Sequence, residues 1–107
     1  MKIDLPELLI FFDELKPATN EEHGFYWFET SRPDGISISF IFSIYESYVS
    51  VIIQTGIKTD VASVRLTKCS EIRVLDEKRK CLEILHANGT GRCFLSLLEG
   101  TILNYSD

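Results

Sequence analysis

The sequence lacks the short motifs that mark the common catalytic sites. It contains no Gly-x-Ser-x-Gly segment for a nucleophilic serine, and none of its cysteines sits in a known nucleophile signature. Histidine, the usual general base near neutral pH, occurs only at His23 and His86. Gly89-Thr90-Gly91 lies between two expected strands, so it lacks the helix N-terminus that binds phosphate. We therefore expect a protein without enzymatic activity and without a cofactor.

Cysteine is also scarce. Cys69, Cys81 and Cys93 are odd in number and widely spaced, which does not fit a disulfide framework. There is no Cys-x-x-Cys pair for zinc, and neither histidine has a cysteine or carboxylate at ligand spacing, so we expect no metal site. Free cysteine packs as a small hydrophobic residue. We expect buried free thiols and hence a reducing, cytoplasmic location.

Long apolar runs are missing as well. No stretch approaches the roughly 20 residues that a membrane-spanning helix needs. Residues 8–12 are apolar but few, and acidic residues flank them, so we expect no secretory signal there. The net charge of −5 and the pI near 5.0 oppose unaided binding to nucleic acid or to an anionic membrane. We expect neither as a direct partner.

The acidic charge is unevenly distributed. Residues 1–50 carry nine acidic and three basic side chains, whereas residues 51–107 carry seven acidic and eight basic ones. An acidic half favours a basic partner, because opposite charges steer association. The alternative is that the charge serves only solubility.

Alternation of apolar and polar residues dominates what is present. Residues 36–44 place isoleucine and phenylalanine at even positions and mostly serine at odd ones, and residues 48–55 alternate in the same way. This period predicts two half-buried strands, and the short link 45–47 makes them antiparallel neighbours at the centre of a sheet. Similar runs between turn residues predict further strands at 24–31, 61–67, 70–75, 80–86, 92–98 and 101–105.

One helix is expected at residues 5–15. Asp4 is a good N-cap, Pro6 suits the first turn, and Lys16-Pro17 would end the helix. Its apolar residues recur at three- and four-residue spacing, so one face would cover the sheet. The predicted fold is α+β: a single domain of residues 1–107, with one N-terminal helix packed on a twisted antiparallel meander of about seven or eight strands.

Acidic and aromatic residues cluster in sequence around the first hairpin. Tyrosine can anchor a protein interface, and carboxylates at its rim can steer a basic partner. The alternative is that Tyr26 and Trp27 belong to the core. The turn at 32–35 and the link at 45–47 should lie at opposite ends of the strand between them. The candidate partner-binding residues are Glu21, Glu22, Tyr26, Glu29, Asp34, Tyr45, Glu46 and Tyr48.

Three stretches resemble those of small bacterial immunity proteins, which neutralise toxins of contact-dependent growth inhibition and related polymorphic toxin systems. They are Phe25-Tyr26-Trp27-Phe28-Glu29, Val61-Ala62-Ser63-Val64 and Arg92-Cys93-Phe94-Leu95-Ser96-Leu97. The chain resembles that group in type over its whole length, as a small acidic protein with one helix and a meander. No diagnostic motif is shared, so no functional residue is carried over.

The resemblance implies an inhibitor whose partner is a cognate toxin domain. Many such toxins are nucleases with basic substrate clefts, which an acidic protein can cover. The alternative function is a small ligand-binding or regulatory module, because a twisted sheet can hold a pocket. The sequence does not show which strand edges are covered, so it leaves the oligomeric state open.

Overall fold

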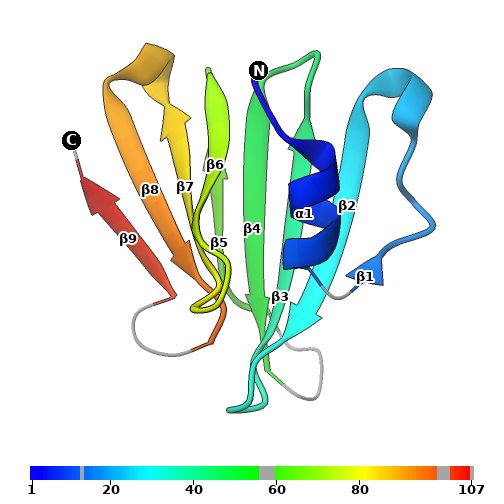
Figure 1. The fold of residues 1–107 in the computed structure, drawn as a ribbon, viewed down its shortest axis with the longest axis vertical. Helices are drawn as coiled ribbons and strands as arrows, with labels where there is room; N and C mark the ends of the chain where they lie inside the picture. Colours follow the sequence, from blue (N-terminus) through cyan, green and yellow to red (C-terminus); the bar gives the residue numbers. More distant parts are fainter. Residues whose placement is uncertain (13, 56–59, 99–101, 107) are drawn as a thin grey trace.

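The computed structural model of the chain describes residues 1–12, 14–55, 60–98 and 102–106. These residues form one α-helix and two antiparallel sheets (Figure 1). The strands of the larger sheet are β1 (Glu14–Leu15), β2 (Phe25–Ser31), β3 (Ser37–Ser43), β4 (Tyr48–Gln54) and β5 (Asp60–Leu66). Those of the smaller sheet are β6 (Glu71–Asp76), β7 (Cys81–His86), β8 (Gly91–Ser96) and β9 (Leu103–Ser106). Short 3-10 turns, η1 (Glu21–His23) and η2 (Ala87–Gly89), precede β2 and β8.

The antiparallel character and the N-terminal helix are confirmed, but the single meander of seven or eight strands is wrong. The meander breaks after β5, where Lys68 adopts a left-handed backbone conformation with φ 53°. The Cys69 amide then donates to the Ser47 carbonyl at 2.8 Å, and β6 pairs with β7 instead of β5. Alternation in a sequence defines the two faces of a strand but not its neighbours, so it did not reveal the break.

The helix begins where the sequence predicts. In α1 (Leu5–Phe11), the Asp4 carboxylate accepts a hydrogen bond from the Glu7 amide at 3.1 Å, which satisfies one of the free N–H groups of the first turn. The helix ends at Phe11, so the predicted end at Leu15 is wrong. Residues 14–15 form β1 instead and pair with β2.

Tertiary contacts explain this early end. Phe12 has an extended backbone, and its ring stacks at 5.0 Å on Phe28 and at 4.9 Å on Phe40. The last turn of α1 has no basic residue of its own, but the Lys80 ammonium group donates to the Phe11 carbonyl at 2.8 Å. A cation there complements the partial negative charge of the helix end. Helix α1 therefore ends at Phe11 because of contacts with residues that are far away in the sequence.

One hydrophobic core joins the helix and both sheets. In Figure 1, α1 and the smaller sheet lie on the same side of the larger sheet, and the core fills the space between these layers. The expected strands 36–44 and 48–55 contribute its centre, as predicted from their alternation. The fully buried side chains are Leu8, Phe11, Phe28, Ile38, Phe40, Phe42, Val49, Val51, Leu82, Ile84, Cys93 and Leu95.

Among the described residues, no helix has the length and apolar character that would let it cross a membrane.

Candidate partner-binding surface

The larger sheet has a second face, which points away from the core. Trp27 lies opposite Ile41, Ile41 opposite Ser50, and Ser50 opposite Arg65, so these residues form one row across β2 to β5. We call the outward surface of these four strands the open face. By strand parity its residues are Phe25, Trp27, Glu29, Ser31, Ser37, Ser39, Ile41, Ser43, Tyr48, Ser50, Ile52, Gln54, Ser63 and Arg65. Ser39 and Ser43 are covered by their neighbours and are buried.

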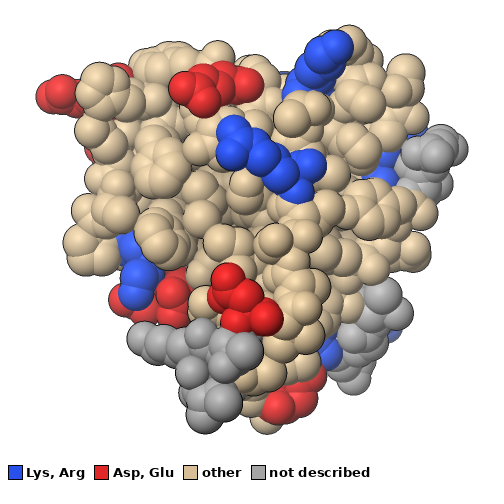
Figure 2. Space-filling model, turned by 180° about the vertical axis from the view of Figure 1, so that it is seen from behind, with Lys and Arg blue, Asp and Glu red and all other residues tan. Residues whose placement is uncertain are grey.

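The open face carries little charge. Glu29 and Arg65 are its charged residues, and Asp60 joins them at the end of β5, where its carboxylate accepts a hydrogen bond from the Gln54 amide at 2.7 Å. Serine is the commonest residue, and large apolar or aromatic side chains stand among the serines. Figure 2 looks onto this side of the molecule and shows a broad expanse of uncharged atoms with separate acidic and basic groups. Low charge with interspersed aromatics is typical of the centre of a protein interface.

Two aromatic residues of the open face have defined surroundings. The Arg65 guanidinium group lies over the Tyr48 ring, 4.0 Å from its centroid, as a cation–π pair. Trp27 is half-buried, and Lys16 and Thr19 hydrogen bond to its backbone carbonyl and amide. Its indole N–H is buried and has no hydrogen-bond partner among the described residues. A ring that is already held in place, as that of Tyr48 is, loses little conformational entropy on binding.

Four of the sequence-predicted residues meet at one end of the open face. Glu21 and Glu22 lie in η1, and Tyr45 and Glu46 lie in the turn between β3 and β4. We call these four residues the acidic rim. The two segments touch at Gly24, whose carbonyl accepts from the Ile44 amide at 2.9 Å.

Gly24 is required where the two segments of the acidic rim meet. Its φ is +65°, and a Cβ atom would lie 3.1 Å from Cδ2 of Tyr45. Both the left-handed backbone and the close ring disfavour any other residue. The ring of Tyr45 nevertheless remains 72% exposed, so it is available to a partner.

Tyr26 was predicted as a binding residue, and the structure places it in the core. It is 7% exposed and stacks on Phe42 at a centroid distance of 5.2 Å. Burial, with Glu21 and Tyr45 nearby, raises the pKa of its hydroxyl group. Tyr26 lies on the same side of β2 as Phe28, so its position in the strand turns it inward. The alternative that it is a core residue is therefore the correct one for Tyr26.

The remaining predicted acids lie away from the acidic rim. Glu29 faces outward in the middle of β2 and pairs with Lys16 at 3.6 Å. Asp34 lies in the turn between β2 and β3, at the opposite end of β3 from Tyr45, as expected. There its carboxylate pairs at 3.2 Å with Arg32, whose guanidinium also donates to the Ser96 carbonyl at 3.1 Å. Asp34 therefore helps to join the two sheets.

The sequence contained signals for the open face that the prediction did not use. Ile41 interrupts the serines of β3, and Ile52 does the same among Ser50 and Gln54 of β4. An apolar residue at an outward position is unremarkable alone. The antiparallel register brings Ile41 beside Trp27, and Ile52 beside Ser39, so that they become one surface.

The histidines and cysteines do not form a common site. His23 is exposed in η1, whereas the His86 ring packs against Gly91 and meets the Tyr105 ring edge-on at 6.4 Å. All three cysteines are free. Cys69 and Cys93 are buried as predicted, and Cys81 is only partly buried. In the described part of the chain, no three His, Cys, Asp or Glu side chains are grouped so that they could hold a metal ion.

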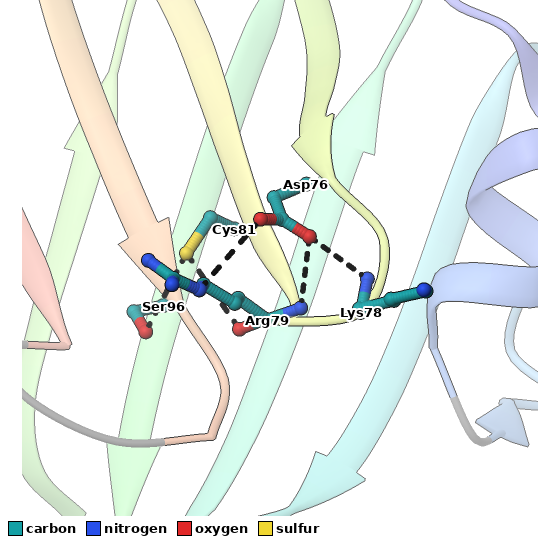
Figure 3. Close-up of polar contacts among 5 residues, drawn as sticks. All are labelled: Asp76, Lys78, Arg79, Cys81 and Ser96. Atoms are coloured by element: carbon teal, nitrogen blue, oxygen red, sulfur yellow. Dashed lines mark hydrogen bonds and ion pairs between the residues drawn. The ribbon is translucent and has the colours of Figure 1, made fainter.

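Cys81 lies beside the charged turn between β6 and β7 (Figure 3). The Asp76 carboxylate holds this turn by accepting the Lys78 and Arg79 amides, both at 3.0 Å. The Cys81 thiol lies 3.6 Å from the Arg79 carbonyl oxygen and 3.9 Å from the Ser96 hydroxyl. Neither group is a base that could activate the thiol as a nucleophile.

A groove of about 500 Å³ lies elsewhere, between residues 2–7 and residues 71–74 of β6. Charges of both signs line it, including Lys2, Asp4, Glu71 and Arg73. Arg73 is also hydrogen bonded to Glu83. The volume of the groove falls in the range of small-molecule sites, although the lining of such sites is usually more apolar.

Comparisons of the chain with models of protein families, with curated proteins and with solved structures found no match.

Proposed function

We propose that this protein binds and neutralises a cognate toxin domain, as immunity proteins do, and that it binds through the open face and the acidic rim. The observation that carries the proposal is the composition of the open face. Trp27, Tyr48 and Arg65 are of the three residue types that most often dominate binding energy in protein interfaces. They stand among serines and isoleucines with little charge between them, which supports a surface that is covered in its working state.

The acidic rim supports a basic partner, such as a nuclease domain with a positive substrate cleft. Glu21, Glu22 and Glu46 are exposed, and no basic side chain of the described residues pairs with them. Carboxylates beside an uncharged centre accelerate association with a positive surface and orient it. In this arrangement the open face supplies the affinity and the acidic rim supplies the speed and the direction of approach.

The first test is co-expression with the C-terminal domain of the protein encoded immediately upstream, which under this proposal is the toxin. We expect the toxin domain alone to arrest growth, and co-expression to restore growth and yield a stable complex of one copy each. Toxicity without rescue or complex would reject the proposal.

Charge reversal then tests the acidic rim. We expect Glu46→Lys to slow association about 10-fold at low salt and to weaken the salt dependence of the association rate, with little change in dissociation. Glu77→Lys is the matched control, because Glu77 is an exposed acid in a turn of the other sheet. Equal effects of the two reversals would show that net charge, and not the acidic rim, steers the partner.

The groove favours a second candidate function, binding of a small charged molecule. The groove is lined by two basic residues, Lys2 and Arg73, and by three acidic residues, Asp4, Glu7 and Glu71. We expect a zwitterionic ligand such as an amino acid or a dipeptide to suit a groove that carries both positive and negative side chains. A thermal-shift screen of such compounds should raise the melting temperature of the wild type but not of a Lys2→Ala variant. Equal shifts in both proteins, or none in either, would reject this function.

A further inference from the structure

We propose that two copies of this protein associate through antiparallel pairing of their β5 strands, which joins the two larger sheets edge to edge. The edge of a sheet presents free N–H and C=O groups that can pair with another strand. In the described part of the chain, β5 pairs with β4 on one side and no strand pairs with it on the other. This inference concerns the protein alone and does not depend on the proposed toxin partner.

The other three edges of the two sheets are shortened or partly covered. β1 has two residues, and β9 has four. The edge of β6 is partly covered by the N-terminal segment, because the Lys2 amide donates to the Ser70 carbonyl at 2.8 Å and the Lys2 carbonyl accepts from Ile72 at 3.0 Å. β5 has seven residues, and most of its length is exposed, with Val61 at 62%. Natural proteins usually protect such an edge with lysine, proline, a β-bulge or a covering segment. The stretch from Val61 to Val64 contains neither lysine nor proline, and its one irregularity is the register shift that leaves Val61 without a partner in β4.

The charges of β5 favour a second copy as its partner. Asp60 stands at one end of the strand and Arg65 near the other. The register shift at Val61 places Asp60, which pairs with Gln54, on the same face as Arg65, so both point to the open side of the sheet. A two-fold axis perpendicular to the sheet places the start of one strand beside the end of the other and keeps the two open faces on the same side. A register centred on Ser63 then brings Arg65 of each copy next to the Asp60 end of its partner. Because of the two-fold symmetry, each dimer would contain this contact between Arg65 and the Asp60 end twice.

Arg65 can serve this contact without leaving Tyr48. Stacking on the ring at 4.0 Å uses the flat face of the guanidinium group. Its N–H groups lie in the plane of that group and remain able to donate to a carboxylate. The uncharged residues between the two charged ends would form the continuous strand pairing.

Sedimentation velocity over a range of protein concentrations tests the proposal. We expect the wild type to dimerise as its concentration rises. Asp60→Arg and Arg65→Asp should each weaken the dimer at least 10-fold, because each places like charges together at both ends of the contact. The Asp60→Arg/Arg65→Asp double variant should restore dimerisation. Such rescue cannot arise from loss of folding, and circular dichroism verifies that each variant is folded.

Two further variants make the test specific for β5. Val61→Lys should leave the protein monomeric, because a lysine blocks an edge strand. Leu75→Lys is its matched control, because Leu75 is an apolar residue, 52% exposed, on the edge strand β6. The proposal is overturned if the wild type stays monomeric at every concentration or if the charge-swapped double variant stays as monomeric as the single ones. A dimer that Leu75→Lys abolishes and Val61→Lys preserves would overturn it as well.

Discussion

The outer surfaces of the two sheets meet water differently, although both sheets pack on the same core. On the outward side of the smaller sheet, Arg73 of the edge strand β6 lies directly opposite Glu83 of β7 and is hydrogen bonded to it. The corresponding row of the open face runs from Trp27 through Ile41 and Ser50 to Arg65. The smaller sheet also carries Leu85 and Phe94 outward, on either side of Arg73 and Glu83, and Leu75 is 52% exposed.

This difference bears on function because both surfaces are the outward side of an antiparallel sheet that packs on the same core. Antiparallel sheets commonly present one solvated face with polar or charged residues, and the smaller sheet follows that pattern. Exposure to water explains the serines of the open face but not Trp27, Ile41 and Ile52 among them. The proposal that a partner covers this face accounts for both, because charges at the centre of an interface must be desolvated.

Thiol reactivity should show the largest effect and tests the assignment of inner and outer faces. Burial raises the pKa of Cys69 and Cys93 to about 11 from 9.0, whereas Cys81 points outward from β7. A pKa higher by about two units lowers the thiolate fraction about 100-fold at pH 8. We expect one fast thiol, Cys81, with an aromatic disulfide reagent, and three in denaturant. A Cys81→Ser variant should have no fast thiol.

The same pKa values predict the alkaline limit of stability. The unfolded chain loses these two thiol protons near pH 9, whereas the folded protein keeps them until about pH 11. The unfolded state therefore binds fewer protons in this window, and the free energy of unfolding should fall as the pH rises from 9 to 11. A Cys69→Ala/Cys93→Ala variant should show a smaller fall.

In the thiol-reactivity experiment, two or three fast thiols in the folded protein would contradict the assignment of inner and outer faces.

Removing an aromatic side chain from each face should separate the two faces by function. We expect Trp27→Ala to weaken toxin-domain binding about 30-fold or more, equivalent to about 2 kcal/mol, as for a central interface anchor. Phe94→Ala, on the smaller sheet, should change the affinity less than about two-fold. Calorimetric titration of the purified complex measures both. Because Trp27 is half-buried, Ile41→Ser serves as a milder second variant. Equal losses at Phe94 would remove the functional distinction between the two faces.

Local patterns predicted most strands but not how they assemble. Serine alternation at 36–44 identified Ile38, Phe40 and Phe42 as core residues, and each is 0% exposed. The early helix end depends on Phe12 stacking and on Lys80, which is distant in sequence. The division into two sheets depends on which strands become neighbours after β5. Such non-local contacts leave little trace in the alternation of one segment.

The candidate surface was predictable only where strand parity was used. Tyr26 and Tyr48 are both strand tyrosines, yet Tyr26 is buried with Phe28 and Tyr48 faces outward beside Arg65. Tyr26 is two residues before Phe28 in the same strand, so the alternation alone places both on the same, inward side. The pairing of Glu29 with Lys16 and of Asp34 with Arg32 could not be seen in the sequence order, because each pair forms through the folded geometry of its turn or edge.

Replacing an arginine by methionine should destabilise the protein more on the outward side of the smaller sheet, at Arg73, than on the open face, at Arg65. The Glu83 side chain is 4% exposed, and Arg73 is its hydrogen-bonding partner. Arg73→Met would leave a buried carboxylate without that partner, so we expect a clear fall in melting temperature. Arg65→Met leaves no buried charge behind and should lower it less. An Arg73→Met/Glu83→Leu double variant should recover most of the loss. A greater loss at Arg65 would show that the charged pair does not stabilise the smaller sheet.

The smallest expected effect concerns the coupling of Arg65 to Tyr48. A double-mutant cycle with Arg65→Gln and Tyr48→Leu, followed by chemical denaturation, should give a coupling free energy of about 0.5–1 kcal/mol, typical of an exposed cation–π pair. Ser50→Ala combined with Tyr48→Leu is the control, because Ser50 is an outward-facing residue of the same strand without a charge. Measurable coupling means that the open face holds its arginine in place before a partner arrives. A value no larger than the control would mean that Arg65 moves freely, and its ordering would then oppose binding because of the entropy it loses.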